Sequence, residues 1–553
     1  MQHRDSLNLY FQDSIRKHWE LPAFTDLGGT TMTYKDVARK IAKLHLLFEE
    51  IGIKPGDKVA LCGKNSSMWC VAFLATLTYG AVIVPILPDF KADNVQHLIN
   101  HSDAKLAIVD DAKWEALNPE SMPKLIGSLS VHDFSLTHSN DKILDNARAH
   151  LNELFGKKYP DRFTQEDVNY YIDSKDELCM ISYTSGSTGF SKGVMLPFRS
   201  IWSNVKYCLT YLPTDAGDGV VCMLPLAHMY GLTIDMLRPF VSGNHINILT
   251  RTPSPRIIMD AFAKVHPRYI VTVPLIIEKI IKTRVFPMLD KPLMKLLMKV
   301  PFVDDRLMQK ILASLQETFG GNLQEIIIGG AGLNREVEEF LRKCGFPYTV
   351  GYGMTECGPL ISYANANNNR LASCGRIVDR VEARIDSPDP ANVPGVLYVK
   401  GDNVMLGYYK NQEATDAVFD EDGWMTTGDI CNLDDEGYLY IRGRDKNMIL
   451  GASGQNIYPE EIEDKLNNLP YVAESLIVDG GEGRLVALIY PDIENATAQG
   501  MSENDIMALM EDNIKTLNSH LPAYSQVQRI KIYDEEFEKT PKRSIKRYLY
   551  QNI

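Results

Sequence analysis

Two kinds of apolar pattern alternate along the chain from residue 59 onward. Residues 59–61, 82–84 and 106–109 are short apolar runs rich in valine and isoleucine, which is typical of buried strands. Between them, apolar residues recur at helical spacing. Strands that alternate with helices indicate βαβ units, so we expect an α/β fold with mostly parallel sheets.

Residues 68–87 contain no charged side chain and are numerous enough to span a bilayer. Gly80 interrupts the stretch, and the run Val82-Ile83-Val84 before Pro85 has the composition of a strand. We therefore favour a helix, a turn and a buried strand over a membrane span.

A second strand, turn and helix is predicted around residues 325–341. The apolar run 325–328 leads into a glycine-rich turn at 329–332, and Asn334 is placed to cap a helix with Val337, Phe340 and Leu341 on one face. The start of such a helix is a place where a nucleotide can approach the backbone.

A domain boundary is expected after the polar turn at 434–437 and a short strand at 438–441. We predict a large domain over residues 1–445 and a small one over 446–553. In the small domain, Pro459 opens an amphipathic helix with Ile462, Leu466 and Leu469 on its apolar face. About a hundred residues suffice for an independent α+β unit.

Composition and charge narrow the class of protein. The 553 residues exceed what one core holds, and the net charge of −13 is spread without a basic block, so no nucleic acid partner is expected. Nine cysteines without a CxxC pair favour neither zinc nor disulfides and fit a reducing compartment. The first residues lack the apolar core of a signal peptide, so we expect a cytoplasmic protein.

The run from Tyr183 to Gly193 is the most informative segment. Small hydroxyl residues and glycines let a backbone wrap around phosphate oxygens, and Lys192 adds a positive charge. Gly186, Gly189 and Lys192 lie three residues apart, which is not the GxxxxGK[ST] spacing. The segment predicts a phosphate loop that is not of the Walker type.

Further motifs follow in order: Gly329-Gly330-Ala331, Tyr352-Gly353-Met354-Thr355-Glu356, Thr427-Gly428-Asp429, Gly443-Arg444-Asp445-Lys446 and the run from Gly454 to Glu463. In this order and at these separations they resemble the adenylate-forming family of acyl-CoA synthetases, aryl-CoA ligases, peptide-synthetase adenylation domains and beetle luciferases. The resemblance covers nearly the whole chain. It implies a large N-terminal domain of stacked, mostly parallel sheets with flanking helices and a small β-subdomain, followed by a small mobile α+β C-terminal domain.

The resemblance also implies a binding site for ATP and Mg²⁺. The loop would hold the β- and γ-phosphates through Thr184, Ser185, Gly186, Ser187, Thr188, Gly189 and Lys192. Thr355 would contact the α-phosphate, and Glu356 would bind Mg²⁺ with Thr184 as a second oxygen ligand. The adenosine would be held by Tyr352 stacking on the base, Gly330 and Ala331 through their backbone, and Asp429 with Arg444 at the ribose.

Two further positions are assigned by the resemblance to a movement of the small domain. Lys446 corresponds to the hinge about which that domain rotates, and Gly454 would line a narrow tunnel that admits the thiol of CoA.

The C-terminus departs from the family pattern. The adenylation lysine belongs to a Thr-Pro-x-x-Lys-x-Lys-Arg motif, and here Ser544 occupies the lysine position. Lys542 is our substitute, because it would lie on the same face of an extended segment, and Lys546 is the other same-face choice. Losing such a donor typically slows a reaction about 10²–10³-fold.

The segment Leu224-Pro225-Leu226-Ala227-His228-Met229-Tyr230-Gly231 resembles the acyl-pocket motif, with His228 near the bound carboxylate. The pattern is most similar to long- or medium-chain fatty acyl-CoA synthetases. We therefore expect ATP- and Mg²⁺-dependent formation of acyl-AMP and transfer to CoA. An acyl-AMP ligase that loads a carrier protein and a nucleotide- and acyl-binding protein with little catalysis remain alternatives, whereas the lack of a G-x-S-x-G motif disfavours a serine hydrolase.

Within residues 286–312, Lys291, Lys295 and Lys299 lie at helical spacing beside methionines at 288, 294, 298 and 308. This stripe fits either core packing with a solvated face or peripheral contact with the inner face of a membrane.

The partners expected from the resemblance are a fatty acid, ATP and CoA, with peripheral membrane contact as one interpretation of the stripe. The oligomeric state stays open, with a homodimer among the alternatives.

Overall fold

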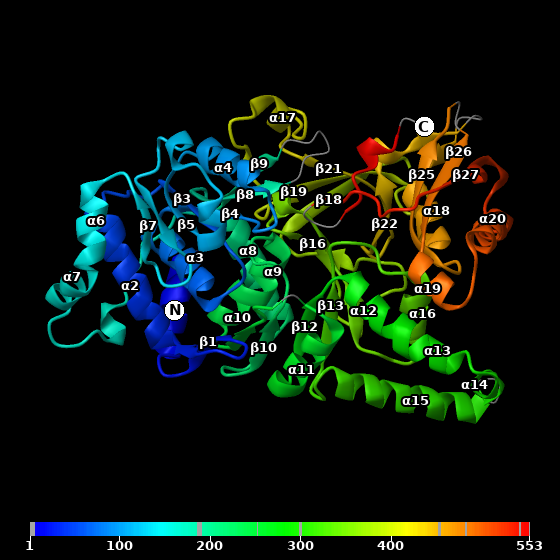
Figure 1. Ribbon diagram of the computed structural model, residues 1–553, viewed down its shortest axis with the longest axis horizontal. Helices are drawn as coiled ribbons and strands as arrows, with labels where there is room; N and C mark the ends of the chain where they lie inside the picture. Colours follow the sequence, from blue (N-terminus) through cyan, green and yellow to red (C-terminus); the bar gives the residue numbers. More distant parts are fainter. Residues whose placement is uncertain are drawn as a thin grey trace.

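The structure, a computed structural model, describes residues 6–184, 191–251, 253–297, 301–451, 455–481, 484–540 and 544–551. It is a mixed α/β protein whose large N-terminal part contains several sheets and whose smaller C-terminal part is α+β, as the sequence predicted (Figure 1). The nine cysteines are free, and all but the partly exposed Cys374 are buried.

An eight-stranded sheet lies at the centre of the N-terminal part. Its strand order is β20 (Gly407–Tyr408), β9 (Lys192–Pro197), β8 (Leu178–Thr184), β4 (Val82–Ile86), β3 (Lys58–Cys62), β5 (Ala104–Val109), β6 (Gly127–Ser130) and β7 (Leu136–Ser139). The five strands from β8 to β6 are parallel, whereas β20, β9 and β7 run antiparallel to their neighbours. Parallel strands need crossover connections, which the intervening helices provide.

The helices of this part of the chain pack around the sheet. They are α1 (Leu7–Lys17), α2 (Tyr34–Glu50), α3 (Ser67–Tyr79), α4 (Ala92–His101), α5 (Asp111–Glu115), α6 (Lys142–Ala149), α7 (Leu151–Lys158) and α8 (Phe198–Tyr211). Figure 1 shows α6 and α7 at the outer left edge of the molecule.

The uncharged stretch 68–87 folds as predicted into a helix, a turn and a strand. The Ser66 side chain caps α3, and the helix ends at Gly80, whose φ of +87° suits a residue without a side chain. A Cβ at Gly80 would lie 2.8 Å from the ring of Tyr171, so the position also lacks space. Throughout the described residues, no helix combines the length and apolar character needed to cross a bilayer.

Two smaller sheets lie beside the central one. A four-stranded sheet has the order β10 (Gly219–Cys222), β11 (His245–Ile248), β1 (Pro22–Asp26) and β2 (Thr31–Thr33). A parallel sheet consists of β12 (Tyr269–Thr272), β13 (Glu325–Ile328) and β14 (Tyr348–Val350). Their helices are α9 (Met229–Gly231), α10 (Arg238–Val241), α11 (Pro255–Val265), α12 (Pro274–Ile280), α13 (Phe286–Leu289), α14 (Pro292–Leu297), α15 (Pro301–Thr318) and α16 (Arg335–Lys343), with π-helical turns at Leu232–Leu237 and Ile281–Val285.

Residues 286–312 do not form one continuous helix. Pro292 and Pro301 begin α14 and α15, because proline lacks the amide hydrogen that a helix interior needs and is tolerated at a helix start. Among the described residues of the stripe, Met288 lies in α13, Met294 and Lys295 lie in α14, and Met308 lies in α15.

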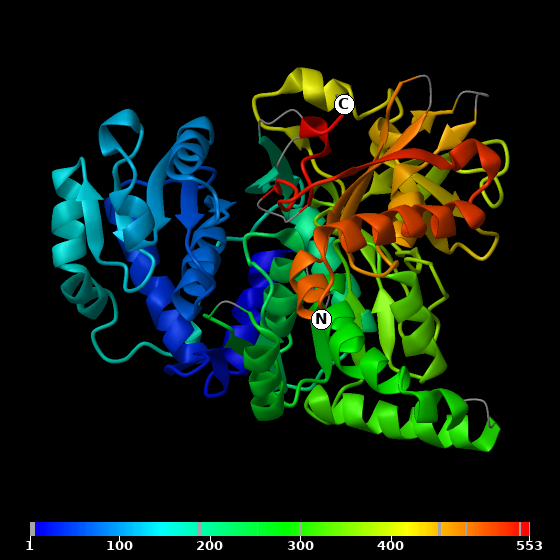
Figure 2. The ribbon, with the colours of Figure 1, turned by 45° about the vertical axis from the view of Figure 1, so that its right-hand side comes forward.

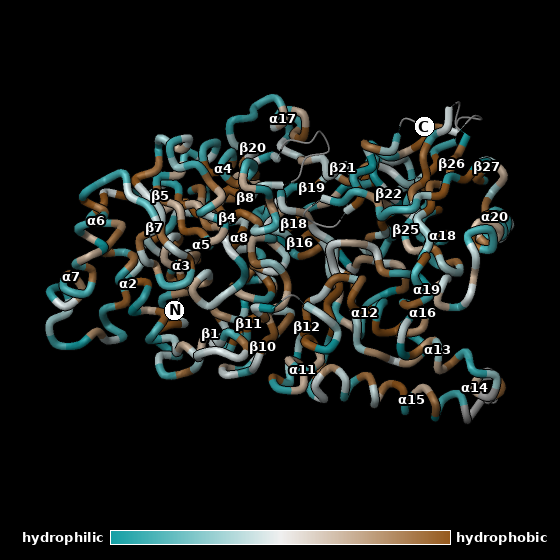
Figure 3. Tube along the Cα trace, in the orientation of Figure 1, coloured by the Kyte–Doolittle hydropathy of each residue, from teal (hydrophilic) through white to brown (hydrophobic). Residues whose placement is uncertain are grey.

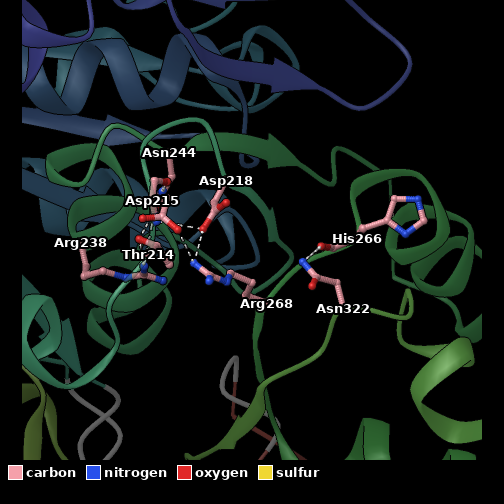
Figure 4. Close-up of polar contacts among 8 residues, drawn as sticks. All are labelled: Thr214, Asp215, Asp218, Arg238, Asn244, His266, Arg268 and Asn322. Carbon is pink, nitrogen blue, oxygen red and sulfur yellow. Dashed lines mark hydrogen bonds and ion pairs between the residues drawn. The ribbon is translucent and has the colours of Figure 1, made fainter. Parts of the chain in front are cut away.

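Polar contacts tie the two smaller sheets together (Figure 4). The guanidinium of Arg238 is buried and donates to Thr214 Oγ1 at 3.1 Å and to Asn244 Oδ1 at 3.4 Å. Close by, Arg268 Nη1 lies 2.8 Å from Asp218 Oδ2. These contacts join the segment before β10 to α10, to the start of β11 and to the start of β12. They therefore hold the start of β12 in place.

The β-subdomain consists of two antiparallel sheets. One contains β15 (Tyr352–Gly353), β16 (Leu360–Tyr363) and β17 (Arg376–Ile377), and the other contains β18 (Val381–Asp386), β19 (Gly395–Gly401), β21 (Met425–Leu433) and β22 (Leu439–Arg444). Helix α17 (Gln412–Asp416) lies between β20 and β21 in the chain.

The described residues after the short helical turn Asp445–Asn447 bury apolar side chains in clusters of their own. The elements are β23 (Ile449–Leu450), β24 (Asn456–Ile457), α18 (Pro459–Leu466), β25 (Val472–Asp479), β26 (Leu485–Pro491), α19 (Ile493–Ala498), α20 (Glu503–Ser519) and β27 (Val527–Ile532). In α18, Ile462 and Leu466 are buried as expected, whereas Leu469 lies beyond the end of the helix. Figure 2 shows this part beside the β-subdomain and above α12 and α16.

Candidate active site

The carboxyl ends of β13 and β14 meet in one place, which is where ligands bind in parallel sheets. Gly329 and Gly330 follow β13, and Gly351 follows β14 and donates its amide to the Ile328 carbonyl at 2.8 Å. Gly330 has a φ of +88°, so the turn there requires a residue tolerant of the left-handed region. The exposed Ala331 continues this turn toward Asn334, which caps α16 as predicted.

Tyr352, Asp429 and Arg444 converge beside this turn. The register of β21 and β22 places Asp429 opposite Arg444, and Arg444 Nε lies 2.7 Å from Asp429 Oδ1. The Tyr352 hydroxyl donates to the other carboxylate oxygen of Asp429. Burial raises the pKa of Asp429, while the nearby guanidinium and the phenol hydroxyl oppose that rise. The Asp429 carboxylate is thus fixed in position beside the Tyr352 ring, where it can accept hydrogen bonds from a ligand.

Thr355 and Glu356 lie in a short helical turn between β15 and β16. Asn204 on α8 fixes the far end of this turn, because its amide donates to the Cys357 carbonyl at 2.9 Å and its oxygen accepts from the Leu360 amide at 2.9 Å. The loop carrying Glu356 is therefore anchored to the buried face of α8.

Tyr408 joins the phosphate-loop strand to Glu356. Its hydroxyl donates to Glu356 Oε1 at 2.9 Å, and Lys192 Nζ lies 4.7 Å from the centre of its ring. Lys192 is in turn paired with Thr184 across β8 and β9. Thr184, Lys192 and Glu356 are thus connected through one tyrosine that sequence reasoning missed.

The donors at this place suit Mg²⁺. No cluster of three His, Cys, Asp or Glu side chains suited to a metal occurs among the residues that the structure describes. Magnesium is commonly held by one or two carboxylates together with substrate phosphates. The single carboxylate Glu356, linked through Tyr408 and Lys192 to the strand that ends at Thr184, fits that cation.

An apolar cavity opens beside the glycine turns and encloses about 540 Å³, including its open mouth. Its lining residues are Tyr207, Cys208, Leu212, Tyr230, Ile234, Ile327, Gly329, Gly330, Gly351, Tyr352, Gly353, Pro359, Leu360 and Tyr363. None of them carries a formal charge at neutral pH. The lining therefore suits an apolar part of a ligand.

Two tyrosines support the cavity wall, the partly buried Tyr230 and the buried Tyr363. Tyr230 donates its hydroxyl to the carbonyls of Thr272 at 3.2 Å and Ile327 at 3.0 Å, which attaches the motif 224–231 to β12 and β13. Tyr363 donates to Glu325 Oε1 at 2.8 Å. Burial raises the pKa of Glu325 to about 7, and the Tyr363 hydrogen bond counteracts part of that rise.

Two further predicted positions, His228 and Lys446, are among the described residues. His228 is partly buried and precedes α9, and its amide donates to the Pro225 carbonyl. Lys446 is exposed in the turn Asp445–Asn447. The predicted residues Ser185, Gly186, Ser187, Thr188, Gly189, Gly454 and Lys542 lie outside the described residues.

The alternative lysine, Lys546, lies among the residues that the structure describes. It forms an ion pair with Glu538, and its amide donates to the carbonyl of that residue at 2.8 Å. Nearby, the Thr540 amide donates to the Ser544 carbonyl, so the segments on either side of residues 541–543 are joined by a hydrogen bond.

The N- and C-terminal parts contact each other near α16. The Asn334 side-chain amide donates to Asn468 Oδ1, and Lys282 Nζ lies 3.4 Å from the same oxygen. Glu278 Oε1 accepts a hydrogen bond from the backbone amide of Asn334 at 2.8 Å. The helix that starts at the glycine turn thus also touches the C-terminal part.

Comparison with known proteins agrees with this geometry. The profile of the AMP-binding enzyme family matches residues 11–409, and that of the AMP-binding enzyme C-terminal domain matches residues 446–552. The long-chain-fatty-acid–CoA ligase of Escherichia coli O6:H1 is 29% identical over 510 residues, which cover 86% of this chain and 84% of that protein. The chloroplastic long-chain-fatty-acid–[acyl-carrier-protein] ligase AEE15 of Arabidopsis thaliana is 26% identical over 535 residues, which cover 84% and 73%.

Among solved structures, the ATP-bound MatB from Rhodopseudomonas palustris superimposes with a TM-score of 0.75 at 22% identity, covering 99% of this chain and 98% of that one. This likeness shows a shared fold.

Proposed function

Because the chain belongs to the AMP-binding enzyme family, we propose that it activates a fatty acid with ATP and then transfers the acyl group to CoA. The observation that carries the acyl part is the uncharged cavity that opens directly beside Tyr352 and the two glycine turns. An apolar tail in this cavity would place its carboxylate near the nucleotide group. The E. coli relative, named a long-chain-fatty-acid–CoA ligase, agrees with this proposal.

The first half-reaction joins the carboxylate to ATP. A carboxylate oxygen attacks the α-phosphorus, the bond to the β-phosphate oxygen breaks, and pyrophosphate leaves with the acyl adenylate retained. Asp429 accepts hydrogen bonds from the ribose, Tyr352 stacks on adenine, and Thr355 and Lys192 stabilise charge on the phosphates. Mg²⁺ bound through Glu356, with Thr184 as a second oxygen ligand, would neutralise charge on the triphosphate.

The second half-reaction uses a thiol. Sulfur attacks the acyl carbonyl, AMP departs with the electron pair of the mixed anhydride bond, and the thiol proton is lost. In this proposal the exposed Lys446 is the hinge that lets the part after residue 445 change position between the two steps, with Gly454 beside the incoming thiol.

A second acceptor has a specific observation in its favour. The Arabidopsis relative is named for transfer to an acyl carrier protein. The same acyl adenylate would serve either acceptor, so this alternative changes only the second step.

The test is fatty-acid-dependent exchange of labelled pyrophosphate into ATP, measured from acetate to palmitate, for the parent and Asp429→Asn. We expect exchange with fatty acids in the parent and a loss of about 10²–10³-fold in the variant, because a held charged acceptor is removed. ATP binding without exchange for any acid would refute the ligase proposal and favour a binding protein. Assays of the second step with CoA and with a carrier protein would identify the acceptor.

A further inference from the structure

The helices α13 and α14 form the outer end of a helical arm that α15 connects back to the body of the protein. Figures 1 and 2 both show α14 at the extremity of the molecule, far from the central sheet. On α15, Met308, Ile311 and Leu315 are buried in the cluster around β12 to β14. The base of the arm is therefore part of the core, whereas core packing does not explain the apolar side chains at its outer end.

The end of the arm exposes apolar side chains. Leu296 on α14 is 63% exposed and Met288 on α13 is 36% exposed. Pro287 and Pro292 are also exposed. Figure 3 shows apolar positions on the outer helices of this region. We name residues 286–297 the arm tip.

The arm tip lies in the middle of a basic segment. Residues 279–299 contain six lysines and arginines and a single acidic residue, Asp290, in a chain whose net charge is −13. Lys279, Arg284 and Lys291 are exposed. A positive segment of this length in an acidic protein indicates a partner with negative charge.

We propose that the arm tip docks on the surface of an anionic phospholipid bilayer. Exposed apolar side chains insert at the boundary between headgroups and acyl chains, and the flanking lysines and arginines bind the anionic headgroups. Each of these two signals alone gives marginal binding, whereas together they give stable association. An acidic protein would satisfy the charge but would leave the need for an apolar, fluid surface unmet.

The docking proposal is independent of the proposed acyl chemistry, because it is tested without ATP or a fatty acid. The full-length protein is sedimented with vesicles of phosphatidylcholine alone and with vesicles of phosphatidylcholine mixed with phosphatidylglycerol. We expect binding to the mixed vesicles only, with affinity that falls as salt is added.

Two double variants separate the two signals. Lys279→Gln with Lys291→Gln should weaken binding to the mixed vesicles about 10- to 30-fold, since each basic residue near the surface contributes a factor of about five. Met288→Ser with Leu296→Ser should weaken it at least about tenfold at unchanged charge.

Matched controls alter exposed residues elsewhere. Lys157→Gln with Lys515→Gln removes two exposed charges, and Ile143→Ser with Val393→Ser removes two exposed apolar side chains. All four variants should keep the thermal unfolding midpoint of the parent, which shows that the fold is intact.

Vesicle binding that is lost in both arm variants and retained in both controls would support the proposal. Equal binding of the parent to neutral and anionic vesicles, or equal losses in arm and control variants, would overturn it. Failure of the parent to sediment with either vesicle would also overturn it and would leave an acidic protein as the occupant to seek.

Discussion

Replacing Tyr408 with phenylalanine removes one hydroxyl group and keeps the ring over which Lys192 lies. That hydroxyl donates to Glu356 Oε1 at 2.9 Å, and a hydrogen bond to a charged group is worth about 1.5–3 kcal/mol. Side chains that orient a metal ligand typically contribute about 10–100-fold to metal affinity. We therefore expect Tyr408→Phe to raise the half-saturating Mg²⁺ concentration by about 10–100-fold.

The assay is pyrophosphate exchange at a fixed fatty acid concentration, titrated with Mg²⁺. The rate at saturating Mg²⁺ should change little, because Glu356 and Lys192 are still present. Tyr409→Phe is the matched control, since the neighbouring hydroxyl donates instead to Asp103 Oδ2 at 2.8 Å. An unchanged Mg²⁺ dependence in Tyr408→Phe, or the same shift in Tyr409→Phe, would refute the role assigned to Tyr408.

Three further predictions follow from the cavity, from a buried carboxyl group and from the C-terminal lysines. Tyr207→Ala should lengthen the cavity and shift exchange toward longer acids by about fourfold per added methylene that fits, and an unchanged order of acids would contradict this. The pKa of Glu325 is about 7 in the folded protein, compared with the ordinary value of 4.5. Between these two pH values the unfolded chain binds fewer protons than the folded protein. The free energy of unfolding should therefore fall by about 3 kcal/mol as the pH rises from 4.5 to 7. Urea unfolding across this range should show a shallower pH dependence for Glu325→Gln, and identical slopes would refute the assignment. For the tail, Lys542→Ala should reduce exchange about 10²–10³-fold while Lys546→Ala, which breaks an ion pair with Glu538, should have a small effect; the reverse order would make Lys546 the adenylation lysine.

Local signals made much of the fold predictable. The β13 strand, the glycine turn and the Asn334 cap are encoded within seventeen consecutive residues, 325–341, so neighbouring residues suffice to specify them. The same holds for the stretch 68–87, where Gly80 ends one element and the β-branched run starts the next.

Long-range pairings were not predictable in this way. Tyr408 belongs to a two-residue edge strand with no periodic pattern, and its partner Glu356 lies 52 residues earlier. Tyr207 is one of many buried positions on α8, and its place at the cavity depends on how that helix packs against β13 and β16. The resemblance to a known family supplied Asp429 and Arg444, whose pairing is set by the register of β21 and β22.

The distribution of cysteines makes the protein its own reporter of local opening. Eight thiols are buried, and the last cysteine in the chain is Cys431, so none lies after the turn Asp445–Asn447. A thiol reagent can modify a buried cysteine only when the surrounding structure opens, and the labelling rate measures how often that happens. Labelling would therefore record opening of the N-terminal part and would not respond to unfolding of the C-terminal part alone. The stability of the N-terminal part can thus be measured separately in the intact chain.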